Sequence, residues 1–151
     1  MAELQTEIVE MKHCTPAVAD AVNRLLEQLC GTPGTATVAG LQAIADSPST
    51  RLFLLQAEGR IIGMCTLAQY ASPTGRKAWI EDVVVDSAMR GHGLGRLLVK
   101  HAADAAMAVD GCKLMLTSRP SRVAANRMYA SMGFEKRETN VYMMSPRGME
   151  R

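Results

Sequence analysis

The spacing of apolar residues changes repeatedly along the chain, and it predicts a mixture of helices and strands. Apolar side chains three and four positions apart indicate a helix. Four segments show this spacing: residues 16–30, 38–45, 94–109 and 122–132. Thr15 and Ser121 stand where capping side chains are expected, and Pro16 suits a first helical position. Glycines follow as helix stops: Gly31, Gly111 and Gly133.

Seven shorter runs have the composition of β-strands, because they are apolar and are bounded by turn residues. These runs are residues 4–11, 52–57, 61–70, 78–85, 114–116, 134–137 and 141–144. Glu58-Gly59-Arg60 is a hairpin signal, and Val83-Val84-Val85 fits a strand that is covered on both faces. The order of elements predicts one α/β domain over residues 1–151. In it, a mixed sheet of about seven strands is flanked by about four helices.

Length and composition agree with a single folded domain. The chain has 151 residues, of which 48% are hydrophobic and 21% are charged. No apolar run approaches the ~18 residues of a membrane-spanning helix, and the first residues lack the pattern of a signal peptide. We therefore expect a soluble, cytoplasmic protein with no membrane partner.

Charge is distributed unevenly between the two halves. Residues 1–75 carry four Lys and Arg against seven Asp and Glu, whereas residues 76–151 carry thirteen against eight. The overall net charge of +2 is too small to indicate a nucleic-acid partner, but the basic second half suggests that it binds a small anion. The cysteines are far apart and form no CxxC pair, so we expect free thiols and no metal site. They are Cys14, Cys30, Cys65 and Cys112.

The most informative segment is Arg90-Gly-His-Gly-Leu-Gly95, between an apolar strand and a strong helix. Glycines let backbone N–H groups turn toward one point and let a ligand come close. The first N–H groups of a helix lack internal partners and lie at the positive end of its dipole, so a pyrophosphate fits there. The spacing is neither that of a Rossmann fingerprint nor that of a Walker loop. A glycine-rich turn without a ligand remains the alternative.

Two motifs in this order resemble the GNAT superfamily of N-acetyltransferases. Arg90-Gly-His-Gly-Leu-Gly95 is similar to its acetyl-CoA pyrophosphate loop. Ala125-Asn126-Arg-Met-Tyr129-Ala-Ser-Met-Gly133-Phe134 is similar to its Asn-x-x-Tyr-x-x-x-Gly-Phe segment. The resemblance covers about residues 6–144 and points to an uncharacterised bacterial branch. Ile80-Glu-Asp-Val-Val-Val85 also resembles glucosamine-6-phosphate N-acetyltransferases, although the C-terminal third is less similar to theirs.

The resemblance implies where acetyl-CoA binds. The strand before the loop splays from its neighbour at a bulge, and its main chain then binds the pantetheine arm through Val83, Val84 and Val85. The loop residues that the resemblance assigns to the pyrophosphate are Arg90, Gly91, His92, Gly93, Leu94, Gly95 and Arg96. Asn126 is implied in a contact with the pantetheine arm or with the loop after the preceding strand. Tyr129, one helical turn further on, is implied as the acid that protonates the departing thiolate.

Glu81 and Asp82 interrupt an apolar strand, where an unpaired carboxylate is expensive to bury. Either could take a proton from the amine directly or through water, and Glu81 is the preferred candidate. The alternative is a structural carboxylate that pairs with an arginine or caps backbone N–H groups. We expect His92 to be a solvent-facing spacer and His101 to be a packing residue.

The leading hypothesis is an enzyme that moves an acetyl group from acetyl-CoA to a primary amine in a ternary complex. The alternative is an acyl-CoA-binding sensor or subunit without turnover. The acceptor, a small molecule or a peptide amine, is not defined by these residues. A homodimer is predicted through the apolar run Val141–Met144, since an exposed strand edge tends to find a partner.

Overall fold

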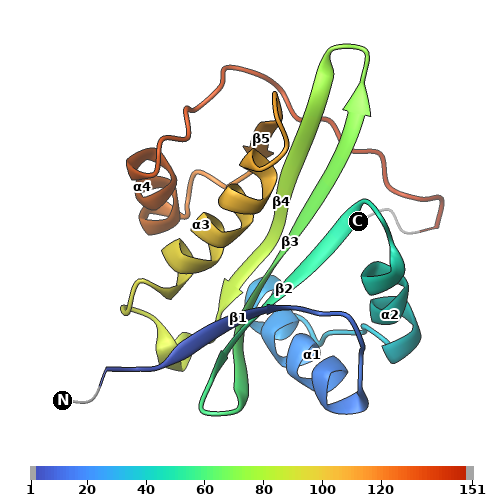
Figure 1. The fold of residues 1–151 in the computed structure, drawn as a ribbon, viewed down its shortest axis with the longest axis vertical. Helices are drawn as coiled ribbons and strands as arrows, with labels where there is room; N and C mark the ends of the chain where they lie inside the picture. Colours follow the sequence, from blue (N-terminus) through green and yellow to red (C-terminus); the bar gives the residue numbers. More distant parts are fainter. Residues whose placement is uncertain (1–2, 149–151) are drawn as a thin grey trace. The chain divides into compact units, whose positions relative to one another are not determined.

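The computed structural model describes residues 3–148. It divides the chain into two compact units, Met1–Thr117 and Ser118–Arg151, which are described separately. The first unit contains all five strands of the described chain and three of its α-helices. The second contains one helix and an extended segment (Figure 1).

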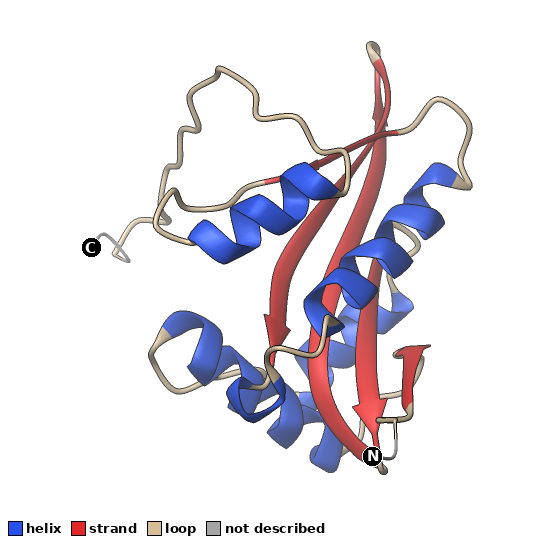
Figure 2. Ribbon diagram, turned by 90° about the vertical axis from the view of Figure 1, so that its left-hand side faces the viewer, coloured by secondary structure: helices blue, strands red, loops and turns tan. Residues whose placement is uncertain are grey.

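The first unit is built on one five-stranded sheet in the order β1-β2-β3-β4-β5. Figure 2 shows its strands in red. Its strands are β1 (Thr6–Glu10), β2 (Thr50–Ala57), β3 (Arg60–Ser72), β4 (Gly75–Val85) and β5 (Lys113–Leu116). The first four strands pair antiparallel with their neighbours in sequence, and β5 pairs parallel with β4. The parallel pair needs a crossover, which α3 (Leu94–Met107) supplies.

Helices cover both faces of this sheet (Figure 1). One face packs on α1 (Pro16–Cys30) and α2 (Val38–Asp46), and its core includes Leu25, Leu41 and Met64. The other face packs on α3, where the Cys65 thiol donates to the Leu98 carbonyl and the rings of His101 and Phe53 meet edge to face at 4.7 Å. His101 is therefore a packing residue, as predicted, although much of it remains exposed.

Local sequence signals explain where the helices begin and end. Thr15 caps α1 by accepting a bond from the Val18 N–H, with Pro16 at the first helical position, and Gly31 ends the helix at φ 75°. All three features confirm the prediction. Helix α3 ends slightly earlier than predicted, and its exposed Lys100 and Asp104 form the ion pair that their spacing allows.

The second unit corrects the predicted strand count from about seven to five. Its helix is α4 (Val123–Ser131), and the segments 134–137 and 141–144 are not strands. Strand backbone groups need a neighbouring strand, and residues 118–148 contain none. The side chains of Val141, Tyr142, Met143 and Met144 are 74–95% exposed. The prediction of a dimer through this run stays a prediction.

The start of α4 also differs from the sequence-based expectation. Arg122 rather than Ser121 is the N-cap residue, and no side chain caps the first turn. Gly133 follows the C-cap residue Met132 with φ 98°, as its predicted role as a helix stop requires.

Candidate functional site

Two glycines shape the loop that leads into α3. Gly91 has φ 86° and Gly93 has φ 73°, a backbone conformation that side-chain-bearing residues rarely adopt. Gly93 is the N-cap of α3, so this helix has no capping side chain. A Cβ atom at either glycine would meet no atom within 4 Å, so the space beside the backbone is open.

The start of α3 therefore suits an anion. The N–H groups of Leu94 and Gly95 precede the first helical hydrogen bond, which joins the Leu97 N–H to the Gly93 carbonyl. The first turn contains no acidic residue, and the exposed Arg90 lies just before the loop. The charge of Arg90 and the N–H groups of Leu94 and Gly95, which have no acceptor within the helix, thus lie at the positive end of the helix dipole.

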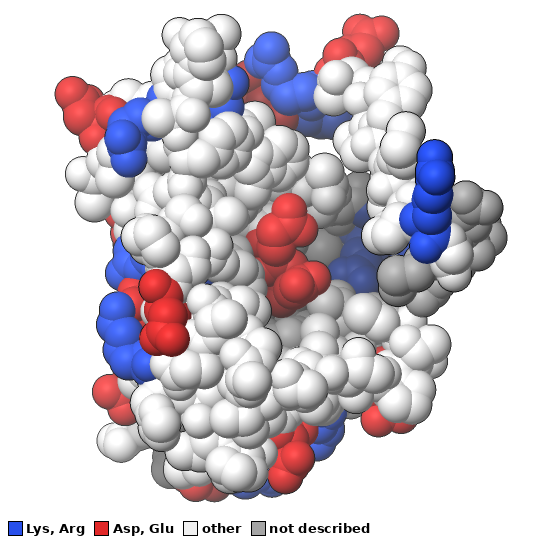
Figure 3. Space-filling view, turned by 90° about the vertical axis from the view of Figure 1, so that its right-hand side faces the viewer, with Lys and Arg blue, Asp and Glu red and all other residues white. Residues whose placement is uncertain are grey.

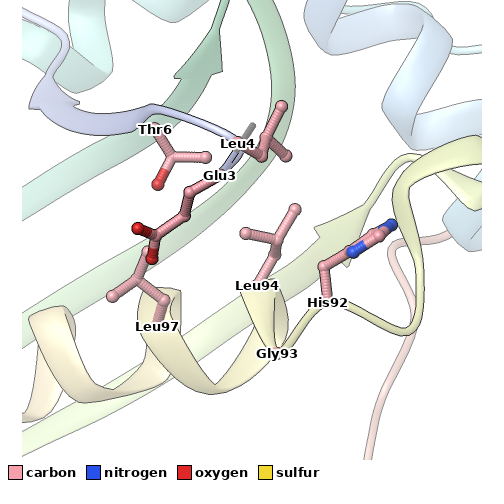
Figure 4. A pocket seen from close by; sticks show the side chains of 7 residues that line it. All are labelled: Glu3, Leu4, Thr6, His92, Gly93, Leu94 and Leu97. Carbon is pink, nitrogen blue, oxygen red and sulfur yellow. The ribbon is translucent and has the colours of Figure 1, made fainter. Parts of the chain in front are cut away.

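A cavity of about 300 Å³ flanks the loop on the side of β1 (Figure 4). Glu3, Leu4 and Thr6 line it from the N-terminal segment, and the remaining wall comes from the loop and the first turn of α3. The Glu3 carboxylate extends toward Leu97, and the ring of His92 points away from Glu3. The Glu3 carboxylate and the leucines in this wall are poor partners for a pyrophosphate.

The strand before the loop carries the irregularity that the family resemblance implies. In the pairing of β3 with β4, Thr66 faces Glu81 but Met64 faces Val84, so β4 contains one extra residue. Asp82 lies in this bulge with φ 51°. Pairing of β4 with β5 ends at Ile80. Residues 81–85 thus extend past the end of β5. Their backbone lies outside the hydrogen-bonded pairing of β4 with β5.

Glu81 and Asp82 are both exposed at this bulge. Partial burial raises the pKa of Glu81, and the negative charge of Asp82 raises it further. The three ion pairs among residues 3–148 involve neither carboxylate. The structural alternative of an arginine partner is therefore not observed within this range. Figure 3 shows acidic side chains near the middle of one face.

The second unit holds the other two predicted site residues. The Asn126 amide nitrogen donates to the carbonyls of Arg119 and Arg122, each at 2.9 Å, and so ties the loop before α4 to the helix. This is the loop contact that the sequence left as one of two possibilities. Tyr129 packs edge to face on Phe134 with ring centroids 5.9 Å apart, and the Phe134 N–H donates to the Tyr129 carbonyl.

Two features at the site were not predicted from the sequence. The position of the bulge at Asp82 has no local signal, because aspartate tolerates a positive φ without requiring one. The Trp79 indole N–H donates to the Tyr70 hydroxyl at 3.2 Å across the β3–β4 hairpin. Alternation along the two strands could have suggested that pair once their register was known.

Three further features of the described residues concern metal-ligand clusters, membrane-spanning helices and a buried thiol. Among residues 3–148, no three His, Cys, Asp or Glu side chains gather in a way that could hold a metal ion. No helix in the same range is both long and apolar enough to span a membrane. Burial raises the pKa of the Cys65 thiol to about 12, which makes this thiol a poor nucleophile.

Comparison with known proteins agrees with this geometry. Residues 20–134 match the model of the acetyltransferase (GNAT) family. A candidate acetyltransferase from Agrobacterium tumefaciens str. C58 has a similar structure, with TM-score 0.81 and 25% identity over 92% of this chain and 99% of that one. A Trypanosoma brucei acetyltransferase gives TM-score 0.74 and 25% identity over 93% of this chain and 100% of its own.

A third similar structure is the aminoglycoside N-acetyltransferase AAC(6')-Iy in complex with CoA. It has TM-score 0.76 and 18% identity, over 95% of this chain and 97% of that one, and it supports the fold alone. The family match covers most of the chain and includes the glycine loop, the bulged strand and the segment from Asn126 to Phe134. The chain thus belongs to the acetyltransferase (GNAT) family of acetyl-CoA-dependent enzymes, and it has that family's α/β fold.

Proposed function

We propose that this enzyme transfers the acetyl group of acetyl-CoA directly to a primary amine while both substrates are bound. The observation that carries the proposal is the end of β4. There a bulge, a carboxylate and a strand end extending past β5 come together just before the glycine loop. A bond forms between the amine nitrogen and the acetyl carbon, the carbon–sulfur bond breaks, and CoA leaves as the thiol.

The residues present fit acetyl-CoA. The loop residues 90–96 would hold the pyrophosphate through backbone N–H groups and the charge of Arg90 and Arg96. The main chain of Val83, Val84 and Val85 would bind the pantetheine arm. This assignment agrees with the burial of the Val84 side chain, which is 5% exposed and packs in the core. With its side chain buried, Val84 would act through its backbone atoms.

Glu81 is the proposed base that takes the proton from the attacking amine. Its raised pKa makes it a better proton acceptor than an ordinary carboxylate, although it is then ionised only at higher pH. Asp82 and a water molecule are the alternatives.

If Glu81 is the base, kcat/KM rises as the pH increases through the pKa of Glu81. Asp82→Asn lowers that pKa by removing a negative charge, so the acidic limb moves to lower pH.

Tyr129 is the proposed acid that gives a proton to the departing sulfur. Phe134 supports the ring, and Asn126, one turn earlier, fixes the loop before α4. General acid catalysis of this kind contributes about 10²–10⁴-fold to the rate. Tyr129→Phe should keep the fold and the CoA affinity and lower kcat by about 10²-fold, with an equal loss in kcat/KM.

The test is a thiol-release assay with acetyl-CoA and a panel of amines, accompanied by a CoA titration. Amine-dependent release is expected, and it should fall in Glu81→Gln and Tyr129→Phe. CoA binding without release for any amine would favour the acyl-CoA sensor. If Tyr129→Phe reacts at the wild-type rate when chemistry limits turnover, solvent rather than Tyr129 protonates the sulfur.

A further inference from the structure

The face of the sheet that carries Glu81 also carries an aromatic pair with no role in the proposed reaction. Side chains alternate along a strand, and Met64 of β3 faces the core under α1 and α2. The later residues of β3 on that same face are Thr66, Ala68 and Tyr70. Glu81 lies opposite Thr66, and Trp79 lies opposite Ala68. Glu81, Trp79 and Tyr70 therefore follow one another along a single face of the hairpin.

Packing closes two of the directions from Glu81 on this face. The next row toward the helices contains Met64 and Val84, which are 2% and 5% exposed. Leu52 of β2, which pairs with Thr66, is 3% exposed. The direction along the hairpin toward Trp79 is therefore open to an acceptor whose amine meets Glu81.

The side chains in that direction favour a cation. Trp79 is half-buried, and its bond to the Tyr70 hydroxyl fixes the indole, while Tyr70 is 46% exposed. Aromatic ring faces attract ammonium groups, and tryptophan does so best. Glu81 and Asp82 add two negative charges that have no ion-pair partner within residues 3–148.

Positive charge marks the far end of this surface. Lys77 follows Trp79 on the same face, and its ammonium donates to the Ser72 hydroxyl at 2.8 Å and to the Thr74 hydroxyl at 2.6 Å. These bonds hold it at the tip of the hairpin. The surface thus has negative charge at Glu81, then Trp79, and then Lys77 opposite Tyr70.

We propose that Glu81, Trp79 and Tyr70, here called the Trp79 platform, select acceptors that carry a second ammonium group. Glu81 and Trp79 are two positions apart along β4, so the second charge lies roughly 7 Å from the reacting nitrogen. A short aliphatic diamine fits this spacing, whereas a longer polyamine brings its next charge toward Lys77. The inference rests on the proposed function, since it takes Glu81 as the base.

The kinetic test compares putrescine with n-butylamine, which has the same carbon chain but lacks the second amine. At equal ionic strength, the wild type should show at least about a tenfold higher kcat/KM for putrescine. Trp79→Leu should remove most of this preference, and Trp79→Phe should retain much of it. An unchanged preference in Trp79→Leu would overturn the proposal.

A variant of Lys77 provides a second kinetic test. Lys77→Gln removes the positive end, so kcat/KM for spermidine should rise relative to putrescine. An equal effect on both amines would contradict the proposed order of charges along the hairpin.

Trp79 is the single tryptophan of the chain, so its fluorescence reports binding directly. With CoA bound, putrescine should change this fluorescence saturably, and n-butylamine should not do so at the same concentrations. Equal responses to both amines would overturn the proposal. Turnover of amines without preference for a second charge would overturn the platform but leave the proposed function intact. Absence of turnover with every amine would overturn both.

Discussion

The helices of the first unit begin in two different ways. At α1 and α2, threonine hydroxyls accept bonds from the N–H groups of Val18 and Gly40. At α3, the N-cap is Gly93, which has no side chain to offer. A capping hydroxyl stabilises a helix by satisfying its own donors, which are then unavailable to a ligand. The start of α3 has no capping side chain and lacks this stabilisation. Its backbone N–H donors stay available to an anion.

A missing cap alone does not make a binding site. Helix α4 also begins without a side-chain cap, but an asparagine within it binds the preceding loop. Helix α3 differs because two glycines with positive φ precede it and Arg90 stands beside them. The comparison teaches that the loop before the helix distinguishes an anion site from an ordinary helix start.

The largest effect is expected from Gly93→Val. A β-branched residue at φ 73° strains the loop by about 1–2 kcal/mol and blocks the approach of a phosphate to the backbone. Loss of charge-assisted hydrogen bonds should weaken CoA binding by about tenfold to a hundredfold, measured by calorimetry.

Gly111→Val is the matched control. Gly111 has φ 72° and equally open surroundings, but it lies after α3. It should cost similar stability and leave CoA affinity unchanged. If both variants lose affinity equally, the effect comes from strain and not from the loop.

Arg90→Gln should give a smaller loss. Arg90 is exposed, so its attraction for a phosphate is partly screened by water and salt. We expect CoA affinity to fall about threefold to tenfold. The difference between wild type and variant should shrink as salt rises. A difference that is independent of salt would argue against a direct charge contact.

Thr15→Ala tests the capped helices. Removing the hydroxyl that accepts from the Val18 N–H should lower the free energy of unfolding by about 1 kcal/mol. CoA affinity should stay at the wild-type value, because this helix start holds no ligand. Denaturant unfolding and a CoA titration measure the two quantities, and a weakened affinity would remove the distinction between the two kinds of helix start.

The smallest effect concerns Glu10, the last residue of β1. Burial alone would raise the pKa of Glu10, but hydrogen bonds from Lys12 and Arg51, together with their charges, lower it on balance. The resulting stabilisation is present above the ordinary carboxyl pKa of 4.5 and is lost as pH falls through the lowered value. Glu10→Gln should cost up to about 1 kcal/mol at pH 7 and less in acid. An equal loss of unfolding free energy at pH 7 and in acid would contradict this account.

Sequence reasoning predicted well what local signals determine. Thr15, Pro16 and Gly31 bounded α1, while the spacing of apolar residues located α2, and apolar runs between turn residues located β2–β4. It predicted poorly what depends on a distant partner. Val141–Met144 is apolar enough for a strand, but a strand also needs a neighbour, which residues 118–148 do not provide.

The candidate site divides in the same way. The glycine loop is visible in the sequence because a positive φ at a helix start demands glycine. The bulge at Asp82 and the bond between Trp79 and Tyr70 depend on the register of two strands, which the sequence alone does not define. The family resemblance implied a bulge, but only the structure placed it.

The most direct test of the central claim is an amide NMR titration of the protein with CoA. The account predicts saturable shifts of the Leu94 and Gly95 N–H signals, because these donors bind the pyrophosphate. The Val18 and Gly40 N–H signals, which their threonine caps already engage, should stay in place. Binding of CoA that leaves the Leu94 and Gly95 signals unmoved would contradict the assignment of the α3 start as the anion site.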